Sequence, residues 1–241
     1  MKISIIVPAY NEERLLGQTL AQVRQAMTAF LQAGWDSELI VCDNNSTDRT
    51  AELAREAGAS VVFEPLNQIA RARNSGAAAA SGAWLIFVDA DSQPSKGLFE
   101  EVIEQIETGR CLAGGCTIRL DGNYPMGGRC IKVWNWLSRN FRLLAGSFIF
   151  CEAEAFRKIG GFNQELFASE ELDLTRRLKR LGRHTGKKVV ILDRNPLITS
   201  ARKFHLYTFW EYMSFLGRTL ITGGRTLKNR AACGHWYDGR R

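Results

Sequence analysis

Two aspartates, Asp89 and Asp91, directly follow an apolar run, Trp84–Val88, that is typical of a buried strand. Residues two apart in extended backbone point to the same side, so both carboxylates can reach one site. Together with diphosphate oxygens they would form the hard, oxygen-rich environment that suits Mg²⁺ or Mn²⁺. We therefore expect a divalent-cation site here rather than a solvated turn, which is the other interpretation of such a triplet.

A third aspartate, Asp43, follows another strand-like run, residues 39–42. A carboxylate at this position can accept a hydrogen bond from a base imide or a ribose hydroxyl. The alternative is that Asp43 caps the helix that follows. Asn45 or Ser46 can supply that cap instead, which leaves Asp43 for a ligand.

Charged side chains at two helix positions add to the candidate chemistry. Arg71 and Arg73 lie two apart and cannot share a helix face. We favour Arg73 as the one that reaches a phosphate, whose geometry a guanidinium matches, and Arg71 as a surface charge. Glu170, Glu171 and Asp173 open a later helix, where the macrodipole favours acids. One that lies in a cleft can instead act as a general base, and the pattern alone leaves both interpretations open.

The elements that must position these residues alternate along the first half of the chain. The predicted strands are residues 3–7, 39–42, 60–63 and 84–88. The predicted helices are residues 16–30, 47–57 and 69–80. We expect Asn11 to cap the first helix, with acidic residues in its first turn. The alternation predicts one α/β domain with a mostly parallel central sheet covered by helices on both faces.

Ligands of such sheets bind at the carboxyl ends of the strands. We therefore expect the polar clusters at 8–11, 43–45 and 89–91 to meet at one edge. The second half is less regular. Its Gly-rich residues 114–128 predict a loop or an edge strand, with further strands expected at 147–150 and 189–192. The helix that begins at Glu170 is expected to end at Gly182.

Charge is unevenly distributed in this chain of net charge +7. Residues 173–241 carry 16 Lys and Arg against 4 Asp and Glu, whereas residues 1–172 carry 16 against 21. A basic C-terminal third suits an anionic partner or a solvated surface. No stretch approaches the ~20 apolar residues of a spanning helix, and the six cysteines include no C-x-x-C pair. We expect a cytoplasmic protein with reduced thiols.

Taken in order, the motifs resemble the family 2 glycosyltransferases of the GT-A fold. The segments that carry the resemblance are 5–12 (IIVPAYNE), 43–48 (DNNSTD), 72–76 (ARNSG), 89–91 (DAD), 146–148 (GSF), 156–162 (FRKIGGF) and 170–174 (EELDL). The resemblance extends over residues 3–182. It implies an inverting transfer of a sugar from a nucleoside-diphosphate sugar, with a divalent cation.

The resemblance also implies roles for single residues. Residues 8–12 with Asp43 would hold the nucleoside, Arg73 would reach the base or diphosphate, and a basic loop at 200–203 would close on the diphosphate. Asp91, with Asp89, would ligate Mg²⁺ or Mn²⁺. The residues that we assign to nucleotide binding are Pro8, Ala9, Tyr10, Glu12, Asp43, Asn45, Arg73, Asp89, Ala90 and Arg202.

The paired acids of the family usually read Glu-Asp, with the second as catalytic base. Here they read Glu170-Glu171, so Glu171 falls at the base position, with Glu170 and Asp173 as the other candidates. We expect a catalytic domain over residues 1–205, with residues 110–205 on the acceptor side. A basic aromatic tail would follow over residues 206–241.

Two alternatives belong to other classes. A sugar-phosphate nucleotidyltransferase would need a Gly-rich, basic loop after the first strand, and residues 8–13 are neither. A non-catalytic module that binds an anionic surface would leave the acidic clusters unexplained. The expected partners are a UDP- or GDP-sugar and an acceptor that the sequence does not identify, a lipid-linked one included. Contact of the tail with the inner membrane surface stays open, and we expect no nucleic-acid partner.

Overall fold

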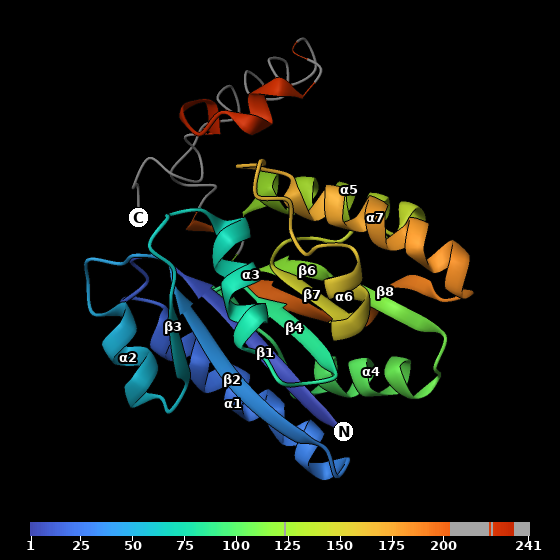
Figure 1. Ribbon diagram of the computed structural model, residues 1–241, viewed down its shortest axis with the longest axis horizontal. Coiled ribbons are helices and arrows are strands. Elements are labelled where there is room, and N and C mark those ends of the chain that lie inside the picture. Colours follow the sequence, from blue (N-terminus) through green and yellow to red (C-terminus); the bar gives the residue numbers. More distant parts are fainter. Residues whose placement is uncertain (123, 203–221, 223, 234–241) are drawn as a thin grey trace.

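The computed structural model describes residues 1–122, 124–202, 222 and 224–233 (Figure 1). Within them, a single eight-stranded sheet runs through the molecule. Its strands are β1 Lys2–Ala9, β2 Asp36–Asp43, β3 Ser60–Phe63, β4 Trp84–Val88, β5 Ser92–Gln93, β6 Cys111–Leu120, β7 Phe148–Glu152 and β8 Lys188–Thr199. The α-helices are α1 Leu16–Gln32, α2 Thr50–Glu56, α3 Ile69–Ala79, α4 Lys96–Glu107, α5 Pro125–Phe141, α6 Ala153–Lys158 and α7 Glu170–Thr185.

The order of the strands across the sheet is β3-β2-β1-β4-β7-β6-β8-β5. The four strands from the first half are parallel, because each is joined to the next by a helix that crosses one face of the sheet. β7 enters antiparallel to β4 and to β6, and β6 pairs with β8 in parallel. The prediction of an α/β domain with a mostly parallel sheet is confirmed.

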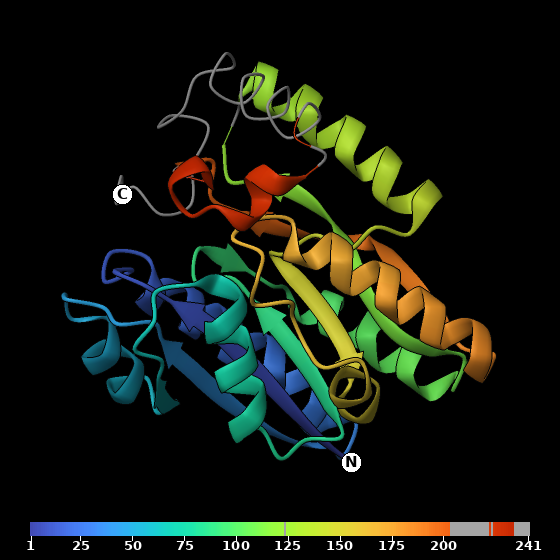
Figure 2. The same cartoon turned by 45° about the horizontal axis from the view of Figure 1, so that its top comes forward.

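Helices cover both faces of the sheet (Figure 1). On one face α1, α2 and α4 pack on a core that includes the fully buried Phe30 and Phe99. On the other face α3, α6 and α7 pack on a second core around Phe87 and Phe162. The apolar residues of α1 recur every three to four positions, which gives that helix the single buried stripe that a sheet face requires. α5 lies at the outer edge of the molecule (Figure 2).

The predicted cap of the first helix is wrong. Asn11 has a φ of 51° and lies outside α1, which begins at Leu16 without a side-chain cap. The Asn11 side chain instead accepts a hydrogen bond from the backbone N–H of Thr47, at 2.8 Å. Asn11 therefore fastens the loop after β1 to the loop after β2, a role that depends on a residue 36 positions away and leaves no local signal.

The second half differs most from expectation. Residues 114–120 belong to β6, which lies inside the sheet between β7 and β8 rather than at its edge. Gly114 is needed there because a Cβ would lie 2.3 Å from Cζ of Phe150. The end of α7 was also predicted too early: Gly182 lies within the helix, which closes at Gly186 with a φ of 72°.

Of the C-terminal tail, the structure describes residues 222 and 224–233. Residues 225–228 and 231–233 form two short 3₁₀-helices, and Leu227 accepts a hydrogen bond from the N–H of Phe167 at 2.7 Å. The predicted basic aromatic tail, residues 206–241, falls mostly outside the described residues. Among the helices that the structure does describe, none has the length and apolar character needed to cross a bilayer.

Candidate active site

The acidic triplet 89–91 continues directly from β4, a fully buried strand near the middle of the sheet. Its backbone is fixed on two sides: Thr19 donates to the carbonyl of Ala90 at 2.7 Å, and the N–H of Ser200 donates to the carbonyl of Asp91 at 3.1 Å. The Asp89 carboxylate meets Arg73 at 2.9 Å, and the Asp91 carboxylate lies 3.5 Å from Arg202. Each aspartate thus already faces a guanidinium.

The loops after β1 and β2 form a second part of the same edge. Ala9 and Asp43 are in register, and the N–H of Asn44 donates to the carbonyl of Ala9 at 2.8 Å. Asp43 is buried and accepts a hydrogen bond from the N–H of Ser46 at 3.1 Å. Asn45 has a φ of 66°, a left-handed conformation that Asn tolerates better than most residues. Asp43 therefore shapes its own loop while staying at the strand end.

Arg202 connects the edge of β1 to the triplet after β4. Its guanidinium donates to both carboxylate oxygens of Glu12, at 2.8 and 3.0 Å, and also approaches Asp91. Burial alone would lower the pKa of Arg202, but the hydrogen bonds and charge of Glu12 outweigh it and raise the pKa. Three segments that the sequence predicted to share a ligand therefore meet at one point, as far as residues 8–12, 89–91 and 200–202 are concerned.

Arg73 lies beneath this edge and is only 2% exposed. It donates to Glu170 at 2.6 Å, to Asp89 at 2.9 Å and to the carbonyl of Gly146 at 2.9 Å. Its guanidinium also stacks over the ring of Phe162, 5.1 Å from the centroid. A buried cation is tolerated only when it is paired in this way. Arg73 thereby joins the triplet after β4 to the first turn of α7.

Glu171 lies next to that network at the start of α7. Burial, together with the charge of Glu170, raises the pKa of Glu171 to about 8. Within the described residues its carboxylate accepts no side-chain hydrogen bond, whereas that of Glu170 is held by Arg73. A carboxyl group whose pKa is close to neutral and which no other side chain holds can accept a proton from a bound hydroxyl.

Comparison with known proteins decides the family. The sequence model described as glycosyl transferase family 2 matches residues 4–160, well over half of the chain. The chain belongs to glycosyl transferase family 2.

Curated relatives of this family 2 glycosyltransferase include two from archaea. A dolichol-phosphate mannosyltransferase from Pyrococcus furiosus is 31% identical over 144 residues, which are 56% of this chain and 36% of that protein. Glycosyltransferase AglE from Haloferax volcanii is 27% identical over 197 residues, 75% of this chain and 62% of that protein. The chain thus spans less than two thirds of either relative.

Solved structures of glycosyltransferases share the fold. The mannosyltransferase PcManGT from Pyrobaculum calidifontis, in complex with GDP-Man and Mn²⁺, superposes with a TM-score of 0.68 at 19% identity, covering 88% of this chain and 60% of that one. Glucosyl-3-phosphoglycerate synthase from Mycobacterium tuberculosis, with Mn²⁺ and UDP-glucose, gives 0.62 at 20% identity, covering 97% and 79%. The fold of this family 2 glycosyltransferase is the GT-A fold.

Asp173, the third acid predicted at the start of α7, has other partners. Its carboxylate binds Arg177 at 2.7 Å and Arg176 at 3.0 Å, both on its own helix. Arg177 also donates to the carbonyl of Ile159, at 2.7 Å. Asp173 therefore fastens α7 to the end of α6, and the structure does not join it to the Arg73 network of this family 2 glycosyltransferase.

Sequence reasoning missed Asn44 as a residue that shapes the site. Its amide nitrogen donates to the carbonyls of Glu64 and Leu66, and its oxygen accepts the N–H of Gln68. These three bonds fix the segment between β3 and α3. Arg73 projects from α3. The only local signal was the position of Asn44 directly after a strand-ending aspartate. That position suggested a turn and not a side chain that holds a neighbouring segment by hydrogen bonds.

By themselves, the carboxylates of this edge supply only part of the ligands that a divalent cation needs. Within the described residues, no three His, Cys, Asp or Glu side chains form a ready-made cluster. Asp89 and Asp91 offer hard oxygen donors, and Mg²⁺ is commonly held by one or two carboxylates together with substrate phosphates. The donor set therefore suits a cation that arrives with, or is completed by, a diphosphate.

Proposed function

We propose that this glycosyltransferase moves a sugar from a nucleoside-diphosphate sugar to an acceptor hydroxyl, with inversion at the anomeric carbon. The observation that carries the proposal is Glu171, a carboxyl group with a pKa of about 8, beside a buried network that ends in the triplet 89–91. A base for the acceptor and a cluster for the diphosphate lie at one edge of the sheet. That arrangement supports direct displacement of the diphosphate.

In the proposed reaction the Glu171 carboxylate takes the proton of the acceptor hydroxyl. The hydroxyl oxygen bonds to the anomeric carbon while the bond from that carbon to the diphosphate oxygen breaks, and the diphosphate leaves with the electron pair. Glu170 keeps its carboxylate on Arg73, which leaves Glu171 as the acid that can change its protonation. One displacement of this kind inverts the anomeric configuration.

We assign the donor to the edge formed by residues 8–12, Asp43, Asn45 and the triplet 89–91. Arg202 would move from Glu12 and Asp91 to the departing diphosphate, because its guanidinium already lies where those carboxylates meet. Direct contact between Arg73 and a nucleotide would require the guanidinium to leave two carboxylates. We therefore propose that Arg73 acts by positioning Asp89 and Glu170.

We assign the cation, Mg²⁺ or Mn²⁺, to Asp91 with Asp89. When bound, it would supply positive charge that stabilises the leaving diphosphate. The presence of Mn²⁺ with GDP-Man in PcManGT and with UDP-glucose in the mycobacterial synthase supports a nucleoside-diphosphate sugar as donor. A cytoplasmic location, and membrane contact through the tail at 206–241, also remain part of the proposal.

The proposal predicts that Asp91→Asn abolishes release of nucleoside diphosphate from a panel of UDP- and GDP-sugars while the protein stays folded. Asp36→Asn is the matched control, because Asp36 is exposed at the opposite end of β2. Excess EDTA should have the same effect as Asp91→Asn. Full turnover in EDTA would contradict the cation, and absence of turnover with every donor would contradict the transfer itself.

A further inference from the structure

A groove of about 1100 Å³ lies between α5 and the edge of the sheet formed by β6, β8 and β5. One wall is α5, with Arg129, Lys132 and Asn135. The other is made by strand residues, among them Arg119 of β6 and Gln93 of β5. No role at this edge follows from the proposed catalytic residues, since none of them lines the groove.

The groove carries cations that the fold does not neutralise. Arg119, Arg129 and Lys132 are exposed, and within the described residues none of them has a hydrogen-bond or ion-pair partner. The one carboxylate in the lining, Asp121, accepts the N–H of Ala201 at 3.0 Å. Elsewhere on the same helix Arg139 is paired with Asp193 at 3.2 Å. Three cations against one carboxylate leave the lining with an excess positive charge of two.

Two links join this groove to the proposed active site. Asp121 holds the backbone of Ala201, the residue before Arg202, and the N–H of Ser200 donates to Asp91. Gln93 of the lining follows Asp91 by two residues. A ligand in the groove would therefore lie against the same backbone that carries Asp91 and Arg202.

α5 also carries exposed apolar side chains. Val133, Trp136 and Phe141 are each more than half exposed, and α5 contains no acidic residue. Trp136 and Phe141 contact each other edge to face at 6.2 Å. Exposed apolar side chains beside unpaired cations suit a ligand that joins an anionic group to a hydrocarbon chain.

We propose that this groove binds the acceptor through a phosphate or diphosphate group, with Arg119, Arg129 and Lys132 as its counter-charges. Guanidinium groups bind phosphate oxygens in pairs, and an excess charge of two matches a doubly ionised phosphate. The inference rests on the proposed function, of which it names the acceptor class. The phosphate can belong to a soluble sugar phosphate or to a lipid phosphate, and the two sources are separable.

Cys130 on α5 offers a local probe. It is exposed, whereas the other cysteines are buried, so a thiol-reactive bimane dye should label it selectively. Bimane fluorescence would be titrated with farnesyl phosphate and farnesol in dodecyl maltoside micelles, and with glucose 6-phosphate and glucose in buffer. We expect at least one phosphorylated compound to bind about tenfold or more tightly than its unphosphorylated partner, and to weaken as salt rises.

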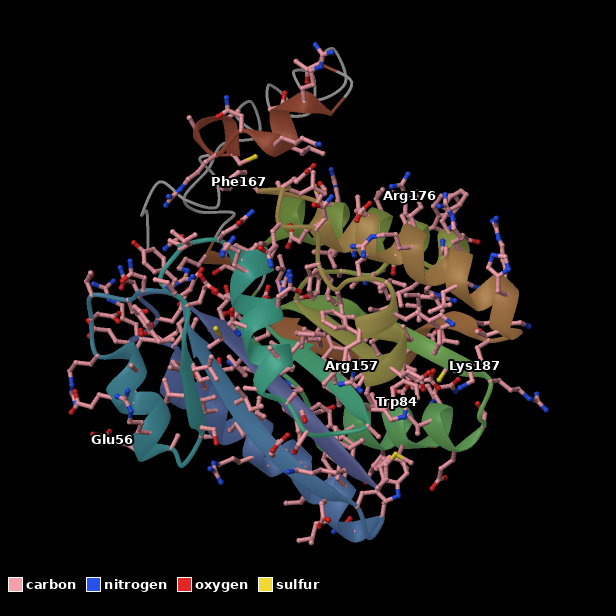
Figure 3. All side chains as sticks on the ribbon, in the orientation of Figure 1. Glu56, Trp84, Arg157, Phe167, Arg176 and Lys187 are labelled. Atoms are coloured by element: carbon pink, nitrogen blue, oxygen red, sulfur yellow. The ribbon has the colours of Figure 1, made fainter. Side chains whose placement is uncertain are left out.

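Variants test whether the groove is responsible. Arg129→Gln with Lys132→Gln should weaken binding of the phosphorylated probe by about tenfold, as should Arg119→Gln. Arg157→Gln with Lys158→Gln is the control, because those exposed cations lie on α6 and do not line the groove. Figure 3 labels Arg157. Circular dichroism and thermal unfolding would establish that every variant is folded.

The outcomes separate clearly. Binding of farnesyl phosphate alone supports a lipid phosphate, and binding of glucose 6-phosphate supports a soluble one. The inference would be overturned by equal binding of phosphorylated and unphosphorylated probes, by no binding of any probe, or by no effect of either groove variant. Displacement of the phosphorylated probe by excess UDP or GDP would also overturn it, because the phosphate would then lie in the donor site. Binding without turnover in the donor panel would contradict the proposed function alone.

Discussion

Arg73 shows how a single buried side chain sets the chemistry of its neighbours. By binding Asp89 and Glu170 it fixes one carboxylate just after β4 and one at the start of α7, elements that lie far apart in the chain. The charge of Glu170 contributes to the raised pKa of Glu171, whereas the charge of Arg73 acts to lower that pKa. An arginine at residue 73 therefore controls the acid–base character of a residue that it does not directly hydrogen-bond.

The raised pKa makes a prediction about pH. A general base works only as a carboxylate, so kcat/KM should rise about tenfold per pH unit below about pH 8 and level off above it. Glu171→Gln should lower transfer by ~10²–10⁴-fold and leave donor binding intact. Steady-state rates between pH 6 and 10 test both. A greater loss of transfer in Glu170→Gln or Asp173→Asn would contradict the assignment of Glu171 as the base.

Unfolding measurements check that the glutamine variant acts on chemistry and not on folding. Folded Glu171 holds its proton up to about pH 8, whereas an unfolded chain releases it near 4.5. Stability is therefore lost as pH rises from 4.5 through 8, because the folded state must then bury a charge. Glu171→Gln has no such charge, so its Tm at pH 9 should exceed that of the parent protein.

The positions of the site residues were predictable, but their partners were not. Asp43, Asp89 and Asp91 could be placed at one edge because each follows an apolar strand, and parallel strands end together. The three bonds of Arg73 could not be predicted, because its carboxylate partners lie 16 and 97 residues away in the sequence. The phosphate ligand predicted for Arg73 stays a prediction, and its bonds to two carboxylates are the reason that we propose a positioning role for it.

At the scale of elements, Gly182 of α7 shows why a glycine is not always a helix end. A Cβ at this position would lie 2.5 Å from the carbonyl oxygen of Lys187 and 2.8 Å from Leu112. The helix passes so close to the start of β8 that only a hydrogen fits. Gly182 permits this close packing, whereas Gly186 adopts the left-handed conformation that ends α7.

Two glycine substitutions should therefore act in opposite directions. Gly182→Ala should lower the free energy of unfolding by about 1–3 kcal/mol, because overpacking outweighs the better helix propensity of Ala. Gly17→Ala in α1, where a Cβ would meet nothing within 4 Å, should raise it by up to about 1 kcal/mol. Urea unfolding of both variants measures the difference. Stabilisation by Gly182→Ala would contradict the close approach.

Two strands of the first half were predicted to their ends, whereas β2 was predicted over half its length and several elements of the second half were missed. Trp84–Val88 and Ser60–Phe63 match β4 and β3 because apolar runs between turn residues mark buried parallel strands. β6 begins with CLAGG, whose paired glycines suggest a loop. Those glycines face Phe150 and Leu144, so the reason for them lies in tertiary packing that local sequence does not express.

At the scale of the whole molecule, Glu38 joins the amino-terminal ends of the central strands. It lies on β2, binds Lys2 of β1 at 2.8 Å, and accepts hydrogen bonds from Ser4 and Ser81. Partial burial alone would raise the pKa of Glu38, but these bonds outweigh it and lower the pKa to about 2. The folded protein therefore favours the ionised form.

This contribution to stability is present above pH 4.5 and is lost as pH falls from 4.5 through about 2. Glu38→Gln should lower the free energy of unfolding at pH 7 by about 1–3 kcal/mol and reduce its dependence on acid. Glu56→Gln, which removes an exposed ion pair with Arg49, should change the free energy of unfolding much less than Glu38→Gln does (Figure 3). Urea unfolding at pH 7 and at pH 3 compares them. Equal losses of unfolding free energy in the two variants would contradict this role of Glu38.

The position of β4 has a consequence for how the protein is made. β4 is bordered by β1 on one side and by β7 on the other, and β7 ends at Glu152. At roughly 5–20 residues per second, a ribosome needs several seconds to go from the end of β4 to the end of β7. Throughout that interval the nascent chain holds a hydrophobic strand with one unpaired edge, which is a template for wrong pairing. That edge closes only when β7 has been made and pairs with β4.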